Sequence, residues 1–132
     1  MKQKLLLVLG FMLVTLGLQA ENTATLSFAD KAQRTAFDTS KQVWKQNGIT
    51  LTNNKASSTN AVADYAKPAR FYANSEIIVE YGSPITKIEF NCNSTSYATA
   101  LKNSIGTTAT VSVNSKKVTA VLPASATSFK IA

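Results

Sequence analysis

The stretch SEIIVEYGSPITKIEFNC, residues 75–92, decides the fold class of this chain. Its two halves, Glu76–Tyr81 and Ile85–Cys92, each alternate apolar and polar residues, and the turn-forming run Gly82-Ser83-Pro84 separates them. Alternation with a period of two places apolar side chains on one face of a strand. Gly, Ser and Pro are the residues that chain reversals favour. The stretch therefore predicts two half-buried strands joined by a turn.

The sequence on either side predicts more short strands. The expected strands are Thr25–Phe28, Val43–Trp44, Ile49–Thr52, Ala69–Tyr72, Ala109–Val113, Val118–Leu122 and Ser128–Ile131. Asn47-Gly48 predicts a hairpin, because both residues tolerate a positive φ angle. Ala29–Phe37 is short and polar, which predicts a helical turn or loop, and Asn53–Ala66 is expected to form an ordered surface loop.

One segment has the period of a helix. Tyr97, Leu101 and Ile105 recur at i, i+4 and i+8, Thr95 or Ser96 can cap the start, and Gly106 can end the helix. A short helix is therefore expected at about residues 96–105. Many short strands with one helix predict an all-β fold, a β-sandwich of jelly-roll type.

The N-terminal twenty residues have the layout of a secretory signal peptide. Lys2 and Lys4 precede an apolar run of 14 residues, Leu5–Leu18, and Ala20 offers a small residue for cleavage. We expect a signal-peptide helix over residues 1–20, which is too short to span a membrane comfortably, since a span needs about 20 apolar residues. Residues 21–132 are then a single domain without a membrane span. The residue directly after the expected cut is Glu21 and not a cysteine, so the product is predicted to be secreted, periplasmic or on the cell surface, and not a lipoprotein.

Composition excludes several classes of protein. The formal charge of +7 falls to +5 when Lys2 and Lys4 are removed, and no basic-aromatic motif accompanies it, so nucleic acid is not an expected partner. The chain has no histidine, which excludes Ser-His-Asp and Cys-His catalysis and imidazole zinc sites. Its one cysteine, Cys92, cannot form an internal disulfide and is expected to be buried.

The carboxylates suggest neither an active site nor a metal centre. Glu76, Glu80 and Glu89 alternate with apolar residues and are expected on a solvated outer face, so no enzymatic activity is predicted. A hydrolase that uses carboxylates alone is the third hypothesis. No cofactor is expected. A structural calcium ion on the scattered aspartates is conceivable, but no D-x-D-x-D-G spacing supports it.

Aromatic and amide residues are the better candidates for a binding site. Sugars stack their C–H faces on aromatic rings, and amide and guanidinium groups meet their hydroxyls. The candidate ligand-binding residues are Trp44, Asn54, Asn60, Asp64, Tyr65, Arg70 and Tyr72. Two alternatives stay open: a single Trp in a hairpin is more often a core residue, and Arg70 can simply pair with Asp64.

Three stretches together resemble a known module. They are LSFADKAQRTAF (Leu26–Phe37), VWKQNGITLTN (Val43–Asn53) and KPARFYANSEIIVEYGSPITKIEFNC (Lys67–Cys92), and SYATALKNSIG (Ser96–Gly106) fits the same pattern. The chain resembles an uncharacterised β-sandwich module that recurs in secreted and surface proteins of polysaccharide-foraging Gram-negative gut bacteria. The resemblance implies a jelly roll similar to galactose-binding-type domains, without catalytic residues. Such modules usually continue past the position of Ala132 with another strand, so truncation is expected.

Two functions follow as expectations. The first is a non-catalytic, exported carbohydrate-binding or surface-attachment module with a glycan or polysaccharide as partner. The second is a structural or protein-interaction module that associates with other surface proteins through its sheet edges and has no glycan ligand.

Overall fold

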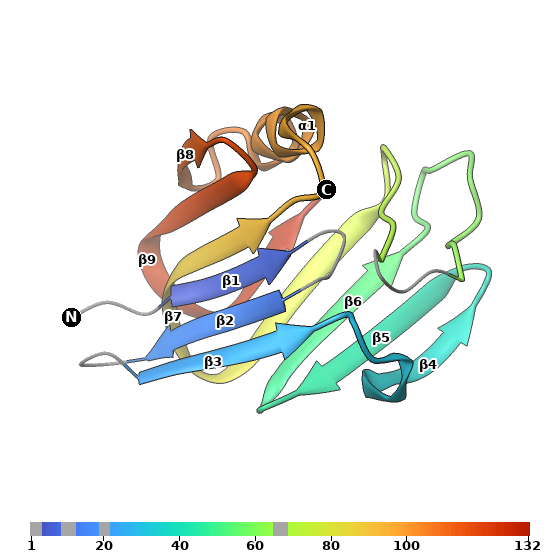
Figure 1. Cartoon of the computed structure of the whole chain (residues 1–132), viewed down its shortest axis with the longest axis horizontal. Coiled ribbons are helices and arrows are strands. Elements are labelled where there is room, and N and C mark those ends of the chain that lie inside the picture. The colour runs from blue at the N-terminus through green and yellow to red at the C-terminus, as the bar shows by residue number, and fades with distance from the viewer. Residues whose placement is uncertain (1–3, 9–12, 19–21, 65–68) are drawn as a thin grey trace.

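The computed structural model describes residues 4–8, 13–18, 22–64 and 69–132. These residues form nine strands, one α-helix and one turn of 3-10 helix, η1 (Lys31–Gln33). The strands are β1 (Lys4–Val8), β2 (Leu13–Leu18), β3 (Asn22–Ser27), β4 (Arg34–Asp38), β5 (Lys41–Gln46), β6 (Ile49–Asn54), β7 (Glu76–Asn91), β8 (Thr110–Asn114) and β9 (Lys117–Ile131). The helix α1 spans Thr95–Ile105. The predicted all-β, sandwich-like fold with one short helix is therefore confirmed (Figure 1).

The strands belong to one hydrogen-bonded sheet that β7 organises. Its main path runs β3-β2-β7-β6-β5-β4, while β1 and β9 also pair with β7, and β8 pairs with β9. β7 and β9 are each continuous, where the sequence predicted two separate strands. Their pairing slips between Glu80 and Ile85 and again between Ile85 and Lys87. Gly82-Ser83-Pro84 thus produces an irregular bend within β7 instead of a chain reversal.

The inner face of the sheet carries the core. One row in register across four strands is Trp44 on β5, Leu51 on β6, Val79 on β7 and Phe129 on β9. All four side chains are buried. The next row toward one end of the sheet contains Asn53, Ile77 and Ile131. The predicted inward face of Ile88, Phe90 and Cys92 is confirmed, since all three are buried.

The hairpin between β5 and β6 forms as the sequence predicts. Asn47 and Gly48 adopt φ angles of 53° and 81°, and strand pairing runs from Gln46↔Ile49 to Lys41↔Asn54. A two-residue turn with both central residues at positive φ matches the natural twist of a hairpin. Asn47 also donates its side-chain Nδ2–H to the carbonyl of Thr25 at 2.7 Å, which ties the turn to β3.

The predicted helix is confirmed, but it is rotated about its axis relative to the face that the sequence pattern predicted to be buried. The cap is Ser94 instead of the predicted Thr95 or Ser96, and its hydroxyl accepts a hydrogen bond from the backbone N–H of Tyr97 at 3.2 Å. Gly106 ends the helix at φ 60°, as predicted. The buried residues are Ala98, Leu101 and Ile105. Tyr97 was expected to share that face, but its 54% exposure places it at the edge of the apolar stripe.

Three local expectations were wrong. Within Ala29–Phe37 the predicted helical turn is present as η1 (Lys31–Gln33), but the residues from Arg34 on form the edge strand β4. Ala69–Tyr72 is not a strand, although Ala69 is buried in the core and Phe71 packs against it. The N-terminal segment expected as a helix contains the strands β1 and β2, while the expected cleavage position at Ala20 lies outside the described residues. Among the helices of the described ranges, none is long and apolar enough to cross a membrane.

Candidate functional site

A cavity of about 270 Å³ opens between α1, the segment 71–75 and the adjoining ends of β7 and β9. We call it the α1 pocket. Its lining residues are Phe71, Tyr72, Ala73, Asn74, Ser75, Ile77, Tyr97, Ala100, Leu101, Ser104, Ile131 and Ala132. Ligand pockets commonly measure about 300–1,000 Å³. The α1 pocket is therefore suited to a small ligand, or to one unit of a longer chain.

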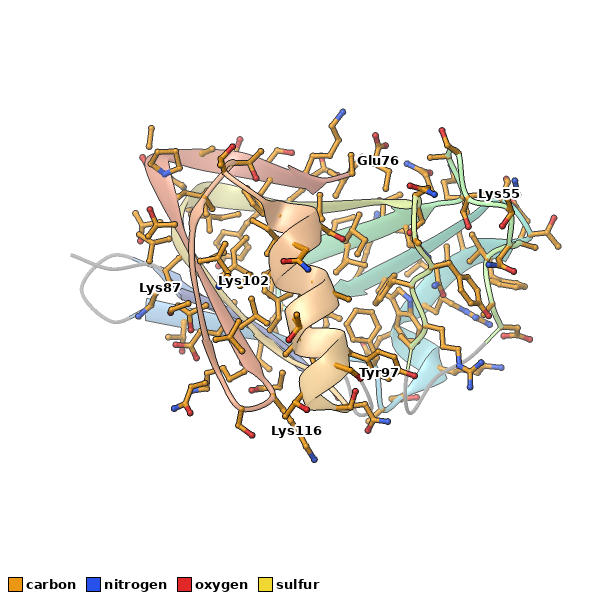
Figure 2. All side chains as sticks on the ribbon, turned by 90° about the horizontal axis from the view of Figure 1, so that it is seen from above. Lys55, Glu76, Lys87, Tyr97, Lys102 and Lys116 are labelled. Atoms are coloured by element: carbon orange, nitrogen blue, oxygen red, sulfur yellow. The ribbon has the colours of Figure 1, made fainter. Side chains whose placement is uncertain are left out.

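The helix contributes one continuous stripe to this pocket. Tyr97, Ala100, Leu101 and Ser104 line it, and residues three or four apart lie on the same helix face. Leu101 belongs to both the core and the pocket, so the stripe is held by the packing of α1. Figure 2 shows Tyr97 projecting from one end of α1, away from the helix axis. A large, mostly exposed ring therefore stands at the rim of an apolar cavity.

The opposite wall is a tight turn before β7. The carbonyl of Tyr72 accepts two hydrogen bonds from Ser75, one from its backbone N–H at 3.2 Å and one from its hydroxyl at 2.7 Å. Asn74, the third residue of this turn, has a φ of 65°. Asn tolerates that left-handed conformation better than most residues with a side chain. The turn brings the half-buried Tyr72 and the exposed Asn74 to the same wall of the pocket.

The pocket combines the two chemistries that a sugar requires. Ile77, Leu101 and Ile131 supply an apolar floor, and two tyrosines supply rings. The side chains of Asn74 and Ser104 add hydrogen-bonding groups at the wall. This arrangement can take a ligand with one apolar face and several hydroxyls.

Trp44 is not part of this or any surface site. It is 0% exposed and contacts Phe28 edge to face, with ring centroids 4.6 Å apart. Its indole Nε1–H donates to Oε1 of the buried Gln42 at 3.2 Å, and the Arg34 guanidinium carbon lies 5.8 Å from its ring centre. A sugar cannot stack on this ring in the folded protein.

Of the other candidate residues that the structure describes, Tyr72 alone lines the α1 pocket. Asn54 ends β6, where its side-chain Nδ2–H donates to Oε1 of Glu76 at 3.2 Å. Asn60 is exposed in the loop, and its backbone N–H donates to the hydroxyl of Ser58 at 3.1 Å. Arg70 is exposed as well. Tyr65 lies outside the described residues.

Asp64 fastens the long loop to the edge of the sheet. Its Oδ1 lies 2.5 Å from Nη2 of Arg34 and 2.9 Å from Nζ of Lys31. The hydrogen bond from Lys31 and then that from Arg34 hold the pKa of Asp64 below its ordinary value of 3.8. The Arg34 guanidinium also stacks on Phe37, 4.3 Å from the ring centre. Asp64 thus acts as a structural clasp, and its partners are Lys31 and Arg34, where the sequence suggested Arg70.

The remaining reactive groups are dispersed. Glu89, expected on a solvated face, is only 5% exposed, and Lys87 and Lys117 lie 3.9 and 3.7 Å from its carboxylate. In the parts of the chain that the structure describes, no three His, Cys, Asp or Glu side chains gather into a metal site. Burial raises the pKa of the Cys92 thiol to about 12, which keeps the sulfur protonated and unreactive.

A second cavity of about 250 Å³ lies beside the β5–β6 turn, lined by residues that include Gly48, Glu80 and Tyr81. It is more open than the α1 pocket and has a mostly polar lining. Glu80 is the one acid among its lining residues. It therefore lacks the apolar surface for stacking and the second carboxylate that glycoside hydrolysis ordinarily uses.

No protein-family model, curated protein or solved structure matches the chain. The functional argument therefore rests on the chemistry of the α1 pocket.

Sequence reasoning missed Tyr97, Asn74, Ser75 and Ser104 as members of one site. The i, i+4, i+8 pattern assigned Tyr97 to the core, because a tyrosine satisfies an apolar period as well as a leucine does. The signal that could have found the site was Ala100, a small residue one turn after Tyr97 that leaves room beside the ring.

Proposed function

We propose that this protein is an exported, non-catalytic carbohydrate-binding module whose ligand site is the α1 pocket. The observation that carries the proposal is the exposed ring of Tyr97 at the edge of an apolar floor, with Tyr72 and Asn74 on the facing wall. Aromatic rings beside amides and hydroxyls are the recognition chemistry of sugars. The resemblance to modules of polysaccharide-foraging bacteria and the signal-peptide layout of residues 1–20 support the same reading.

The proposal concerns one sugar unit at a time. The volume of about 270 Å³ holds a terminal or branch unit, with the rest of a polysaccharide lying in solvent. A single small site of this kind favours weak binding that becomes strong through repetition along a polymer or on a crowded surface. In this proposal the protein attaches to a surface by binding the glycans that the surface carries.

Affinity electrophoresis in gels that contain polysaccharides tests the proposal. Wild type is retarded by at least one polysaccharide, Tyr97→Ala loses about tenfold in affinity, and Tyr97→Phe retains most of the retardation, because stacking requires the ring and not the hydroxyl. Phe37→Ala is the matched control, since Phe37 is also an exposed aromatic residue and does not line the pocket. Equal retardation of wild type and Tyr97→Ala by every polysaccharide contradicts the assignment.

A second candidate function rests on a different observation. β8 pairs on one side with β9, carries no charged residue over Thr110–Asn114, and exposes Val113. An uncharged edge strand is a template for pairing with another chain. A protein-interaction module predicts concentration-dependent association that Val113→Lys abolishes. A strictly monomeric light-scattering profile at all concentrations excludes this function.

A further inference from the structure

The floor of the α1 pocket is aliphatic. Ile77 on β7 and Ile131 on β9 lie directly opposite each other in the antiparallel ladder, and both line the pocket together with Leu101 of α1. Opposite side chains in a sheet have Cβ atoms about 5 Å apart, so the two isoleucines form one apolar patch. All three residues are at most 9% exposed, and none of their side chains can donate or accept a hydrogen bond. A ligand group that reaches this floor must therefore be apolar to bind well.

A methyl group and a hydroxyl group differ sharply at such a floor. A hydroxyl placed there gives up its hydrogen bonds to water and gains none from the protein, which weakens binding. A methyl group in the same place is removed from water, which strengthens binding. The residues of the lining that carry free polar side-chain groups are half-buried or exposed, and they are Tyr72, Asn74, Tyr97 and Ser104. The pocket thus offers hydrogen bonds toward solvent and aliphatic surface at its base.

Among the described residues, no charged side chain lines the pocket. Glu76 and Lys130 flank the floor residues in sequence, but side chains alternate along a strand, so both point to the opposite face of the sheet, where they pair at 3.4 Å. Lys102 is two residues from both Ala100 and Ser104, and two residues turn a helix by about 200°, so it points away from the pocket. A carboxylate in the pocket finds no cationic side chain in this lining, and its burial without a partner is unfavourable.

We propose that the α1 pocket selects an uncharged sugar unit that presents a methyl group, which is either the C6 methyl of a 6-deoxyhexose or the methyl of an N-acetyl group. The methyl group lies on Ile77, Leu101 and Ile131, while the ring hydroxyls lie beside Asn74 and Ser104. At C6 the corresponding hexose carries a hydroxymethyl group and the uronic acid a carboxylate. The inference rests on the proposed glycan-binding function and names the class of sugar that this site takes.

Titration of the full exported protein with matched sugars, followed by NMR, tests the selection. Fucose, galactose and galacturonate of one enantiomeric series differ only at C6, and so do rhamnose and mannose, while N-acetylglucosamine and glucose differ only at C2. At least one methyl-bearing sugar is expected to bind about tenfold more tightly than its hydroxyl-bearing partner, and galacturonate more weakly than either of its relatives. A preference in the C6 sets assigns the deoxy methyl group, and a preference in the C2 pair assigns the acetyl group.

Ile131→Thr and Ile131→Val are a matched pair of variants for the floor. Both shorten the side chain by the same amount, and the threonine alone places a hydroxyl in the pocket. Ile131→Val is expected to keep the preference for the methyl group, and Ile131→Thr to reduce it about fivefold, because the new hydroxyl can pair with the hydroxymethyl group. Circular dichroism shows whether each variant is folded, and the same pair of substitutions at Ile77 replaces any variant that is not.

The outcomes separate this inference from the proposed function. Hydroxymethyl or carboxylate sugars that bind as tightly as the methyl-bearing ones, and that lose binding in Tyr97→Ala, overturn the selection of a methyl group and leave the glycan site in place. An unchanged preference in both threonine variants overturns the role of the aliphatic floor. Binding of no sugar at millimolar concentration, or binding that Tyr97→Ala does not weaken, overturns the proposed function and this inference with it.

Discussion

Trp44 lies where the inner faces of β3, β5 and β6 meet. Phe28 contacts one part of its ring, and Leu51 follows it in register on β6. Because Trp44 is the single tryptophan of the chain, the fluorescence of the protein reports on this point of the core. The emission is therefore expected at the short wavelengths of an apolar environment, resistant to acrylamide, and unchanged by glycan.

Replacement of Trp44 tests its structural role. Trp44→Ala is expected to lower the free energy of unfolding by about 3–5 kcal/mol, since it leaves a cavity among fully buried neighbours. Trp44→Phe should lose less, because it keeps the edge-to-face contact with Phe28. Urea denaturation followed by circular dichroism measures both. A glycan that quenches the emission of the folded protein contradicts the placement of this residue.

Cys92 gives a second prediction at the residue scale. The unfolded thiol ionises near 9.0, while burial raises the folded pKa to about 12. The unfolded state therefore loses a proton first, and stability declines as pH rises from about 9 toward 12. Cys92→Ala should remove this part of the pH dependence. At pH 8 the native thiol should react with a thiol reagent only as fast as the protein unfolds, and rapid modification of the folded protein contradicts its burial.

How far single residues could be predicted depends on what their neighbours in sequence reveal. The burial of Cys92 followed from strict alternation within one strand. Trp44 was predicted to bind ligand and is buried, while Tyr97 was predicted to be buried and is mostly exposed. The local sequence pattern around each of them is compatible with a core position and with a surface position. Which one reaches solvent depends on the rotation of α1 and on the packing of β3 over β5, and both are set by residues distant in sequence.

The loop of residues 55–64 is the element whose order depends most on charge. Its middle is held by the backbone N–H of Val62, which donates to Thr39 at 2.8 Å, and its end by the contacts of Asp64 with Lys31 and Arg34. The pKa of Asp64 lies below 3.8, so the clasp is complete above that pH and is lost as pH falls through the lowered pKa.

Substitution of Asp64 should reproduce the acid effect at neutral pH. Asp64→Asn is expected to raise the rate of hydrogen exchange at the Val62 amide and to speed proteolysis within the loop. The exposed carboxyl of Glu80 lies in another element, which makes Glu80→Gln the control. Unchanged exchange in Asp64→Asn shows that the hydrogen bonds near Val62 suffice without the ion pairs.

Element types were predictable where local chemistry decides them. Asn47-Gly48 determined the hairpin and Gly106 ended the helix, whereas the cap is Ser94 and not the predicted Thr95 or Ser96. The continuity of β7 through Gly82-Ser83-Pro84 was not predictable, because a bend and a reversal use the same residues. Pairing of β7 with β9 on both sides of the bend favours the continuous strand, and that pairing joins residues that lie between 26 (Asn91↔Lys117) and 54 (Ile77↔Ile131) positions apart in the sequence.

At the scale of the whole molecule, the two halves of β7 border different regions of the fold. Its first residues border the α1 pocket, while Lys87–Asn91 borders the space filled by β1 and β2. The bend between them gives β7 both roles.

An NMR titration of the exported protein with the oligosaccharide of the most strongly retarding polysaccharide tests the central claim most directly. The account predicts that backbone amide shifts concentrate at Asn74, Ser75, Tyr97, Leu101 and Ser104, and that Tyr97→Ala reduces them all together. Residues of the second cavity, such as Gly48 and Glu80, should remain unshifted. Saturable shifts that cluster away from α1 and the segment 71–75, or no shifts at millimolar ligand, contradict the assignment of the α1 pocket as a glycan site.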